Sequence, residues 1–345
     1  MNRQITLISG VSCSGKEEVS KDNRLRLNYG ARCSGEFFNI HKKNQLMRIE
    51  TYFKNTVYNS VLFEGYPFWK DTKLDLIHKY FDSMDNLITY APLFLLKERQ
   101  TQKGVKLSEK EMMEVYYLIY HYQKNIPCIN TGSAFKLHNF TLPEFVEEWE
   151  KINQKPTNED ELSFMATLPN KSWADKQYND VELPHNFFKG TITPSETWNR
   201  IKDMGISFKD KTVVDVGCHQ GYYLFKAKEE GAKRCIGYER NEKIVNNAKH
   251  IAWLKQSPVD FLLRDISYHN LPKRDIVICM NMIHYTEMDL ALPRIFNVNT
   301  NEVVFQCDLG KHTDTVELIA KENNFEVIKK ENDRPNRNII WFKRR

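Results

Sequence analysis

The stretch Val213-Val-Asp-Val-Gly-Cys-His-Gln-Gly-Tyr-Tyr223 decides the fold of the C-terminal half. A short apolar run ends in Asp215, and a glycine turn then opens an amphipathic segment. A second apolar run, Arg234–Glu239, ends in another acid 24 positions after the first. Glycine allows a backbone to approach a ligand closely, and a carboxylate at a strand end can accept hydrogen bonds from ribose hydroxyls. We therefore expect an α/β domain that binds a nucleoside cofactor.

The spacing within the glycine turn indicates which cofactor. A dinucleotide site has the pattern G-x-G-x-x-G, in which a helix N-terminus receives the pyrophosphate. This chain instead has Asp215-x-Gly217-x-x-x-Gly221, which puts a carboxylate before the turn. S-adenosylmethionine carries no phosphate, but it carries an amino group that a nearby carboxylate can hold. The pattern favours S-adenosylmethionine over NAD.

Residues 185–345 resemble a class I S-adenosylmethionine-dependent methyltransferase, which implies a Rossmann-like sheet of seven strands. Within that superfamily three segments are most similar to the tRNA wobble-uridine methyltransferase type: Asp215-Val-Gly-Cys-His-Gln-Gly-Tyr222, Gly231-Ala232 and Asn281-Met-Ile-His-Tyr285. His219 departs from the family pattern, which usually has glycine in the middle of the turn. Residues 261–265 are expected to form the third strand and residues 275–281 the fourth. A final antiparallel hairpin is expected from residues 325–329 and 338–343.

The resemblance implies a set of site residues. The cofactor-binding residues would be Asp215, Gly217, His219, Gly221, Glu239, Asp265 and Asn281, with Asp265 meeting the adenine amino group. His284 and Tyr285 follow the fourth strand and are the candidate catalytic residues. A histidine can act as a base near neutral pH if the methyl acceptor must lose a proton. The alternative, that both residues only pack or orient the substrate, is equally open.

The N-terminal half contains a second glycine motif. Within residues 4–16, an apolar run that begins at Gln4 leads into Gly10-Val-Ser-Cys-Ser-Gly-Lys16. This is a G-x-x-x-x-G-K pattern, whose backbone N–H groups can bind phosphates. The next residue is Glu17 rather than the serine or threonine that ligates magnesium. Residues 60–68 are similar to adenylate kinase and related nucleoside monophosphate kinases, with Glu64 in place of the family's acid. Phe68 stands where that family has a phosphate-binding arginine.

This resemblance implies a P-loop kinase-like domain over residues 1–142, with a P-loop NTPase-type parallel sheet. The implied nucleotide-binding residues are Gly10, Ser14, Gly15, Lys16 and Glu64, with ATP and magnesium as ligands. Whether such a domain transfers phosphate or only binds nucleotide stays open. The expected organisation is therefore a two-domain α/β protein, in which a partly ordered acidic linker, residues 143–184, precedes the methyltransferase domain of residues 185–345.

Composition limits the remaining possibilities. The chain has 345 residues, of which 41% are hydrophobic and 28% charged, as in a soluble globular protein. Its start lacks a signal-peptide pattern and no apolar run is long enough to span a bilayer, so a cytoplasmic location and no membrane partner are expected. Its 7 cysteines have no C-x-x-C spacing and its 10 histidines do not cluster, which predicts no metal site.

The function expected from the sequence is methyl transfer to a nucleotide, a nucleic acid such as RNA, or another small phosphorylated acceptor. The net charge of +5 permits nucleic acid as a partner without requiring it. The alternative is a nucleotide-dependent phosphotransferase whose C-terminal domain only binds a ligand. Oligomeric state has no signal in the sequence.

Overall fold

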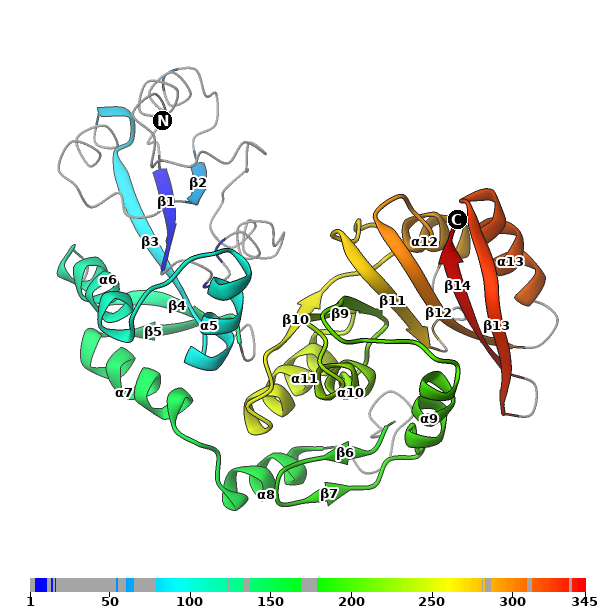
Figure 1. Cartoon of the computed structure of the whole chain (residues 1–345). Coiled ribbons are helices and arrows are strands. Elements are labelled where there is room, and N and C mark those ends of the chain that lie inside the picture. Colours follow the sequence, from blue (N-terminus) through cyan, green and yellow to red (C-terminus); the bar gives the residue numbers. More distant parts are fainter. Residues whose placement is uncertain are drawn as a thin grey trace. The chain divides into compact units, whose positions relative to one another are not determined.

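The structure is a computed structural model that divides into two compact units, Met1–Gln154 and Lys155–Arg345 (Figure 1). It describes residues 4–10, 14, 16, 54, 60–64, 79–122, 125–132, 137–168, 179–280, 282, 287–308, 312–334 and 337–345. The division between the units falls inside the segment predicted as a linker. Within the described ranges, no helix combines the length and the apolar character that a membrane crossing requires.

The N-terminal unit contains a five-stranded sheet with the order β2-β1-β3-β4-β5. Its first four strands are parallel and β5 is antiparallel to β4. The strands are β1 Gln4–Ser9, β2 Ser60–Glu64, β3 Ser83–Tyr90, β4 Ile126–Asn130 and β5 Leu137–Phe140. The helices are α5 Leu93–Gln102, α6 Glu109–Tyr122 and α7 Leu142–Asn153. The rings of Tyr116, Phe145 and Trp149 pack together in its core, with the Tyr116 and Phe145 centroids 4.7 Å apart.

The described part of the segment predicted as an acidic linker is largely helical. It contains most of α7, all of α8 (Asn158–Thr167) and the strand β6 (Val181–Glu182), which pairs with β7 (Phe187–Phe188) just beyond the segment. Two of its acids sit in helix first turns. Glu144 accepts a hydrogen bond from the backbone N–H of Thr141 at 2.7 Å, and Asp160 accepts one from that of Thr157 at 2.7 Å. Such capping boxes satisfy backbone donors that a helix start leaves open.

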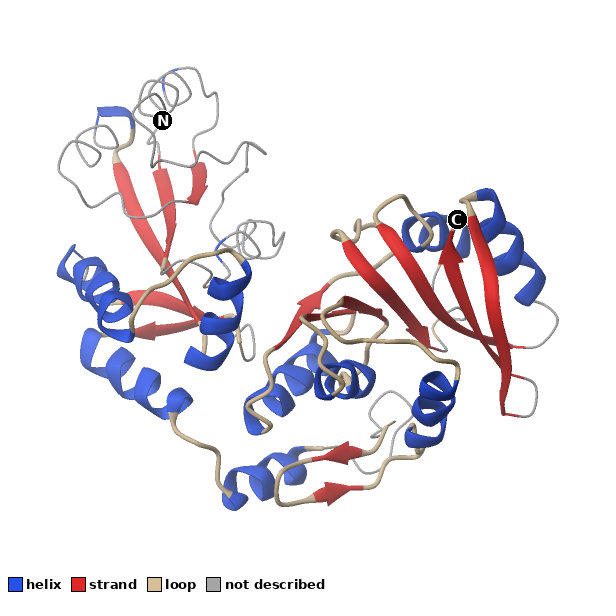
Figure 2. Ribbon diagram, in the orientation of Figure 1, coloured by secondary structure: helices blue, strands red, loops and turns tan. Residues whose placement is uncertain are grey.

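The C-terminal unit contains a seven-stranded sheet with the order β10-β9-β8-β11-β12-β14-β13 (Figure 2). The first five are parallel, and β14 runs antiparallel to both β12 and β13. The strands are β8 Thr212–Val216, β9 Arg234–Glu239, β10 Val259–Leu263, β11 Arg274–Met280, β12 Thr300–Asp308, β13 Phe325–Arg334 and β14 Arg337–Arg344. The helices are α9 Ser195–Asp203, α10 Tyr222–Glu229, α11 Glu242–Leu254, α12 Met288–Ile295 and α13 Thr313–Glu322. The expected Rossmann-like sheet with a final antiparallel hairpin is confirmed.

Alternate residues of the central strands supply two separate cores. Val213 and Ile278 lie in the apolar cluster that also contains Trp198 and Leu224, from α9 and α10. Their neighbour Val214 lies in a second cluster, with side chains from α12 and α13 such as Leu292. Successive side chains of a strand point to opposite faces, so a strand covered on both sides must be apolar at every position. This explains why β8 and β11 read as continuous apolar runs.

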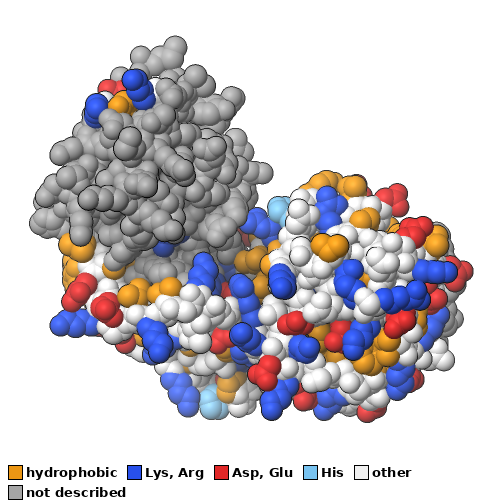
Figure 3. All heavy atoms as spheres, turned by 45° about the horizontal axis from the view of Figure 1, so that its top comes forward, with side chains coloured by type: hydrophobic (Ala, Val, Ile, Leu, Met, Phe, Trp, Pro, Cys, Tyr) orange, Lys and Arg blue, Asp and Glu red, His pale blue; other side chains and the backbone are white. Residues whose placement is uncertain are grey.

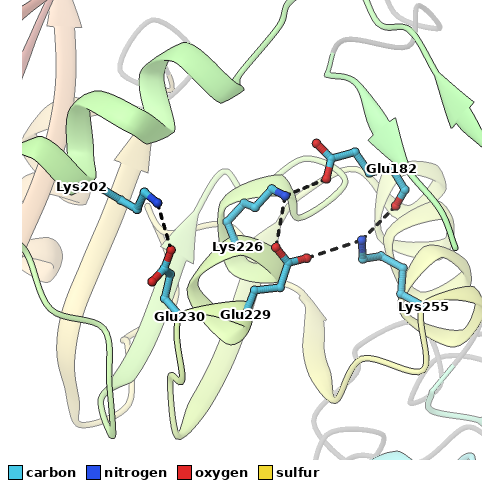
Figure 4. Close-up of polar contacts among 6 residues, drawn as sticks. All are labelled: Glu182, Lys202, Lys226, Glu229, Glu230 and Lys255. Carbon is cyan, nitrogen blue, oxygen red and sulfur yellow. Dashed lines mark hydrogen bonds and ion pairs between the residues drawn. The ribbon is translucent and has the colours of Figure 1, made fainter.

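The β6–β7 hairpin is fastened to α10 and α11 by charged side chains (Figure 4). The ammonium of Lys226 lies 2.7 Å from a carboxylate oxygen of Glu182 and 3.1 Å from one of Glu229. Lys255 donates to the backbone carbonyl of Glu182 at 2.9 Å, and its ammonium is 3.7 Å from Glu229. These contacts hold the chain that precedes the methyltransferase-like sheet against the helix that follows the glycine turn.

Candidate active site

The carboxyl ends of β8 and β9 bring the two predicted acids to one edge of the sheet. Asp215 pairs in register with Gly237, two residues before Glu239 at the end of the neighbouring strand. Gly237 cannot be enlarged, because a Cβ there would lie 2.5 Å from the Cys218 sulfur. The small residue therefore lets the glycine turn pack directly on β9, and it keeps the two carboxylates close to each other.

Backbone geometry explains why positions 217 and 221 of the turn are glycines. Gly217 has φ of 71° and Gly221 has φ of 86°, a region that residues with a Cβ rarely adopt. A Cβ on Gly217 would lie 2.9 Å from the Met282 Cβ, and a Cβ on Gly221 would lie 2.4 Å from Cζ of Phe261. Gly217 and Cys218 both donate backbone hydrogen bonds to the carbonyl of Tyr238, at 2.8 and 3.1 Å. The turn is thus fixed to β9 and has room only for glycine at these two places.

His219 occupies the position where the family pattern favours glycine, and it adopts a glycine-like backbone. Its φ is 50°, and its backbone N–H donates to a carboxylate oxygen of Glu239 at 3.3 Å. Burial lowers the pKa of its imidazole to about 4, so the ring is neutral at pH 7. His219 therefore keeps the turn's shape at a conformational cost, and its neutral side chain adds no positive charge beside the two acids.

Asp215 is the most unusual group of this edge. Its side chain is 1% exposed, and neither carboxylate oxygen has a hydrogen-bond partner within the described part of the chain. Burial, and secondly the charge of Glu239, raise its pKa well above the ordinary range. A buried carboxylate without a donor is costly. The cationic amino group of S-adenosylmethionine would supply both the missing donor and the missing charge, so the residues present fit that cofactor.

Glu239 is held in place from the backbone. Its carboxylate accepts hydrogen bonds from the N–H groups of Asn241 at 2.9 Å and His219 at 3.3 Å, on different oxygens. Burial raises its pKa, and hydrogen bonds from the backbone oppose that rise. Each oxygen keeps lone pairs that two ribose hydroxyls can use. The arrangement matches the role predicted for Glu239.

Asp265 lies two residues beyond the end of β10 and lines an open hollow of about 500 Å³. One of its carboxylate oxygens accepts from the backbone N–H of Ser267 at 2.8 Å, which turns the chain after the strand. The other residues around the hollow are Arg240, Asn241, Leu263, Arg264 and His269. The motifs of the sequence single out none of these five as site residues. They share a position, since Leu263 ends β10 and the other four follow the carboxyl ends of β9 and β10.

The predicted catalytic residues His284 and Tyr285, and the predicted cofactor residue Asn281, lie outside the described residues. Their flanks are described. Met280 ends β11, Met282 contacts the glycine turn as noted above, and Glu287 directly precedes α12. The carboxyl end of β11 therefore lies at the edge where Asp215 lies, because Ile278 of β11 pairs in register with Asp215. The roles assigned to the three residues stay predictions.

In the N-terminal unit, part of the predicted phosphate loop is described. Gly10 has φ of 141°, and a Cβ there would lie 2.4 Å from the carbonyl oxygen of Thr89. The Ser14 hydroxyl is buried 2.6 Å from that of Thr89, and Lys16 donates to the carbonyl of Gly10 at 3.0 Å. Gly15 and the side chain of Glu64 lie outside the described residues. The lysine thus bonds to its own loop, although it follows a parallel strand as predicted.

A comparison with known protein families gives a match within the C-terminal unit. Residues 207–339 match a family model described as "Methyltransferase domain". The C-terminal unit contains a methyltransferase domain. It is of the S-adenosylmethionine-dependent class, as expected from Asp215 and the glycine turn. The matched residues do not reach the N-terminal unit, so the P-loop kinase-like interpretation, with ATP and magnesium, is not supported.

Curated relatives are similar over part of their length. A tRNA U34 carboxymethyltransferase of Helicobacter acinonychis (strain Sheeba) is 26% identical over 98 residues, which cover 27% of this chain and 37% of that protein. One of Campylobacter jejuni (strain 81116) is 27% identical over 113 residues, covering 31% of this chain and 38% of that protein. The matches thus span about two fifths of these relatives.

Two solved structures are similar to part of this chain. A ribosomal protein L11 methylase of Lactobacillus delbrueckii subsp. bulgaricus has 18% identity and a TM-score of 0.38, covering 49% of this chain and 100% of that chain. A magnesium protoporphyrin IX methyltransferase of Synechocystis PCC 6803, solved with bound SAM, has 19% identity and a TM-score of 0.38, covering 44% and 76%. Neither likeness is close enough to carry an argument about a substrate.

Proposed function

We propose that this protein transfers a methyl group from S-adenosylmethionine to a nucleotide of an RNA. The observation that carries the proposal is the buried Asp215 carboxylate, which lacks a hydrogen-bond donor and lies beside Glu239 at the edge where a nucleoside cofactor binds a Rossmann-like sheet. The partial similarity to tRNA U34 carboxymethyltransferases supports RNA as the acceptor.

In this mechanism the protein mainly aligns the reactants. Bound S-adenosylmethionine supplies an activated methyl group on a sulfonium. Asp215 holds the amino group, Glu239 the ribose hydroxyls and Asp265 the adenine amino group. Gly217 and Gly221 keep the wall of the site free of side chains. Displacement in line requires the acceptor atom close to the methyl carbon with water excluded, and such positioning can supply most of the rate enhancement.

His284 and Tyr285 would act on the acceptor. They follow β11 in the sequence, and β11 pairs with β8, the strand that contains Asp215. If the acceptor atom carries a proton, the imidazole of His284 would remove it as the methyl group arrives, and Tyr285 would orient the acceptor. His284→Ala should then lower kcat by about 100-fold or more and leave the affinity for S-adenosylmethionine unchanged. An equal loss with a proton-free acceptor would show that His284 positions the substrate instead.

The test of the proposal uses the full chain. The purified protein is incubated with unfractionated tRNA and S-adenosylmethionine carrying a labelled methyl group, and label in RNA is counted and located by mass spectrometry of the nucleosides. We expect label in RNA with the wild type and at least about tenfold less with Asp215→Asn at the same cofactor concentration, held below the wild-type Kd. Incorporation equal to that of the wild type would refute the site. The same spectra distinguish a methyl from a carboxymethyl group, the group named in the relatives.

A second candidate function is nucleotide binding by the N-terminal unit. The favouring observation is Gly10 at the carboxyl end of β1, where φ of 141° and the close carbonyl of Thr89 leave no space for a side chain. Titration with ATP tests it. Binding that disappears in Lys16→Ala would support it, and equal behaviour of wild type and variant would refute it.

A further inference from the structure

Two arginines, Arg240 and Arg264, line the open hollow beside Asp265 but have no assigned role in binding S-adenosylmethionine. Leu263 pairs in register with Glu239, so Arg264 and Arg240 leave adjacent strands at the same level. Both line the hollow, and Arg240 is exposed. Within the described residues, neither guanidinium group has a hydrogen bond or an ion pair; Arg240 acts on Glu239 through its backbone N–H and through its charge. Adenine and ribose, the two parts of the cofactor assigned to this hollow, are neutral, so they offer no anion to these two positive charges.

The acids around the hollow are already engaged. Asp265 accepts from Ser267, and Glu239 accepts from Asn241 and His219. His269 adds a polar group, because its Nδ1 donates to the carbonyl oxygen of Asp265 at 2.8 Å, which leaves Nε2 for another partner. The guanidinium groups therefore remain available to an outside anion, and arginine suits phosphate because its planar donors fit two oxygens at once.

An exposed aromatic ring lies next to this hollow. Tyr268 is 64% exposed and precedes His269 in the same turn. Its hydroxyl donates to a carboxylate oxygen of Glu287 at 2.7 Å, which fixes the ring while leaving it open to solvent. Glu287 directly precedes α12 and follows the segment that holds His284 and Tyr285. Tyr268 thus connects the cofactor side of the edge with the side assigned to the acceptor.

On the face drawn in Figure 3, the lysine and arginine side chains are interspersed with acidic ones and do not form one large patch. What distinguishes the hollow is the combination of two uncommitted guanidinium groups and a fixed exposed ring. Proteins that bind unpaired RNA use this combination, with cations on phosphates and aromatic rings stacked on bases.

We infer that Arg240, Arg264 and Tyr268 form a contact surface for a single-stranded segment of the acceptor RNA beside the cofactor. The two arginines hold a backbone phosphate at the mouth of the hollow, and Tyr268 stacks on a neighbouring base. This inference rests on the proposed function, because it assumes an RNA acceptor. It adds the location at which the single-stranded RNA segment contacts the C-terminal unit.

The test measures binding of a fluorescein-labelled RNA hairpin with a single-stranded loop, by anisotropy at several salt concentrations. Arg240→Gln/Arg264→Gln should weaken binding by at least about tenfold and reduce the salt slope by about 2. The matched control is Lys233→Gln/Lys273→Gln, which removes the same charge from exposed residues at the amino ends of β9 and β11. Tyr268→Ala should weaken binding about tenfold, whereas Tyr268→Phe should bind as the wild type does.

Calorimetry with S-adenosylmethionine on the same variants separates the alternatives. Unchanged cofactor affinity with weakened RNA binding supports the inference. Arginine variants that bind RNA as the lysine control does would overturn it and leave the proposed function intact. Loss of cofactor affinity with RNA binding retained would also overturn it, because the arginines would then belong to the cofactor site. A wild type that binds no RNA would refute the RNA acceptor itself and this surface with it.

Discussion

Each unit of this protein begins its parallel sheet with a strand that runs into a glycine turn, but the two turns differ in what they leave uncommitted. After β8, Asp215 is buried without a donor, and Glu239 keeps free lone pairs. After β1, Lys16 bonds to the carbonyl of Gly10 and Ser14 lies against Thr89. A ligand site without its ligand contains buried polar groups that lack hydrogen-bond partners. The comparison indicates that the turn after β8 binds a ligand. In the turn after β1, by contrast, the described polar groups already form hydrogen bonds with one another.

The largest effect should come from filling the second turn. Gly221→Ala places a Cβ against Phe261 at a φ of 86°, so we expect a loss of about 2–5 kcal/mol in the free energy of unfolding of the C-terminal unit. Binding of S-adenosylmethionine should be lost, as measured by calorimetry. Gly205→Ala is the matched control, because it has nearly the same φ, 87°, with nothing within 4 Å. If both variants lose binding equally, steric closure of the turn is not the cause.

The equivalent change in the first turn should not reach the cofactor. Gly10→Ala meets the Thr89 carbonyl at 2.4 Å at a φ of 141°, so the N-terminal unit should lose about 2–4 kcal/mol of stability. Because the two turns belong to separate compact units, the affinity for S-adenosylmethionine should stay within about twofold of the wild type. Two-stage thermal unfolding and a cofactor titration measure both quantities. A large loss of cofactor affinity would mean that the units do not act independently.

A change of charge alone tests the incomplete bonding of Asp215. Asp215→Asn keeps the shape and removes the charge, so the affinity for S-adenosylmethionine should fall by about 10- to 100-fold. Without cofactor, the variant should be at least as stable as the wild type at neutral pH, because it lacks a carboxyl group whose ionisation is disfavoured by burial.

The raised pKa of Asp215 determines whether its contribution to stability rises or falls with pH. The pKa of Asp215 is raised in the folded state above the ordinary value of 3.8, so the folded protein binds more protons than the unfolded chain between those two values. The contribution of Asp215 to stability is therefore present below pH 3.8 and is lost as the pH rises through the folded pKa. Unfolding curves of cofactor-free wild type and Asp215→Asn should diverge with rising pH. Curves that stay parallel would contradict an uncompensated carboxylate.

The smallest effect concerns the departure from the family pattern. His219 adopts φ of 50°, which costs a residue with a Cβ about 1–2 kcal/mol, so His219→Gly should recover up to about 1 kcal/mol after the entropy cost of glycine. His219→Asn, which tolerates this backbone better than most residues, is the comparison variant. Denaturant unfolding of both variants measures the difference. A glycine variant that is strongly destabilised would mean that the buried imidazole contributes more through packing than its backbone costs.

Some expectations about elements were wrong in detail for identifiable reasons. The third strand was expected over residues 261–265, but β10 is Val259–Leu263, because the Asp265 carboxylate bonds to Ser267 and turns the chain. The bounds of the partly ordered linker predicted over residues 143–184 stay a prediction, and its described residues form helices on both sides of the division between the units, with Glu144 and Asp160 in the capping boxes. The start of α11 at Glu242 has an equally local cause, because the side chain of Asn241 caps it.

The sequence by itself determined the Rossmann-like sheet, the glycine turn and the two acids, because apolar periodicity and the need for glycine at positive φ are written in neighbouring residues. Only the tertiary structure decided that Asp215 lacks a donor, that His219 takes a left-handed backbone, and that Arg240 and Arg264 leave adjacent strands beside Tyr268. These properties depend on which strands are neighbours and on what is buried between them. Residues far apart along the chain set both, so local sequence patterns do not contain them.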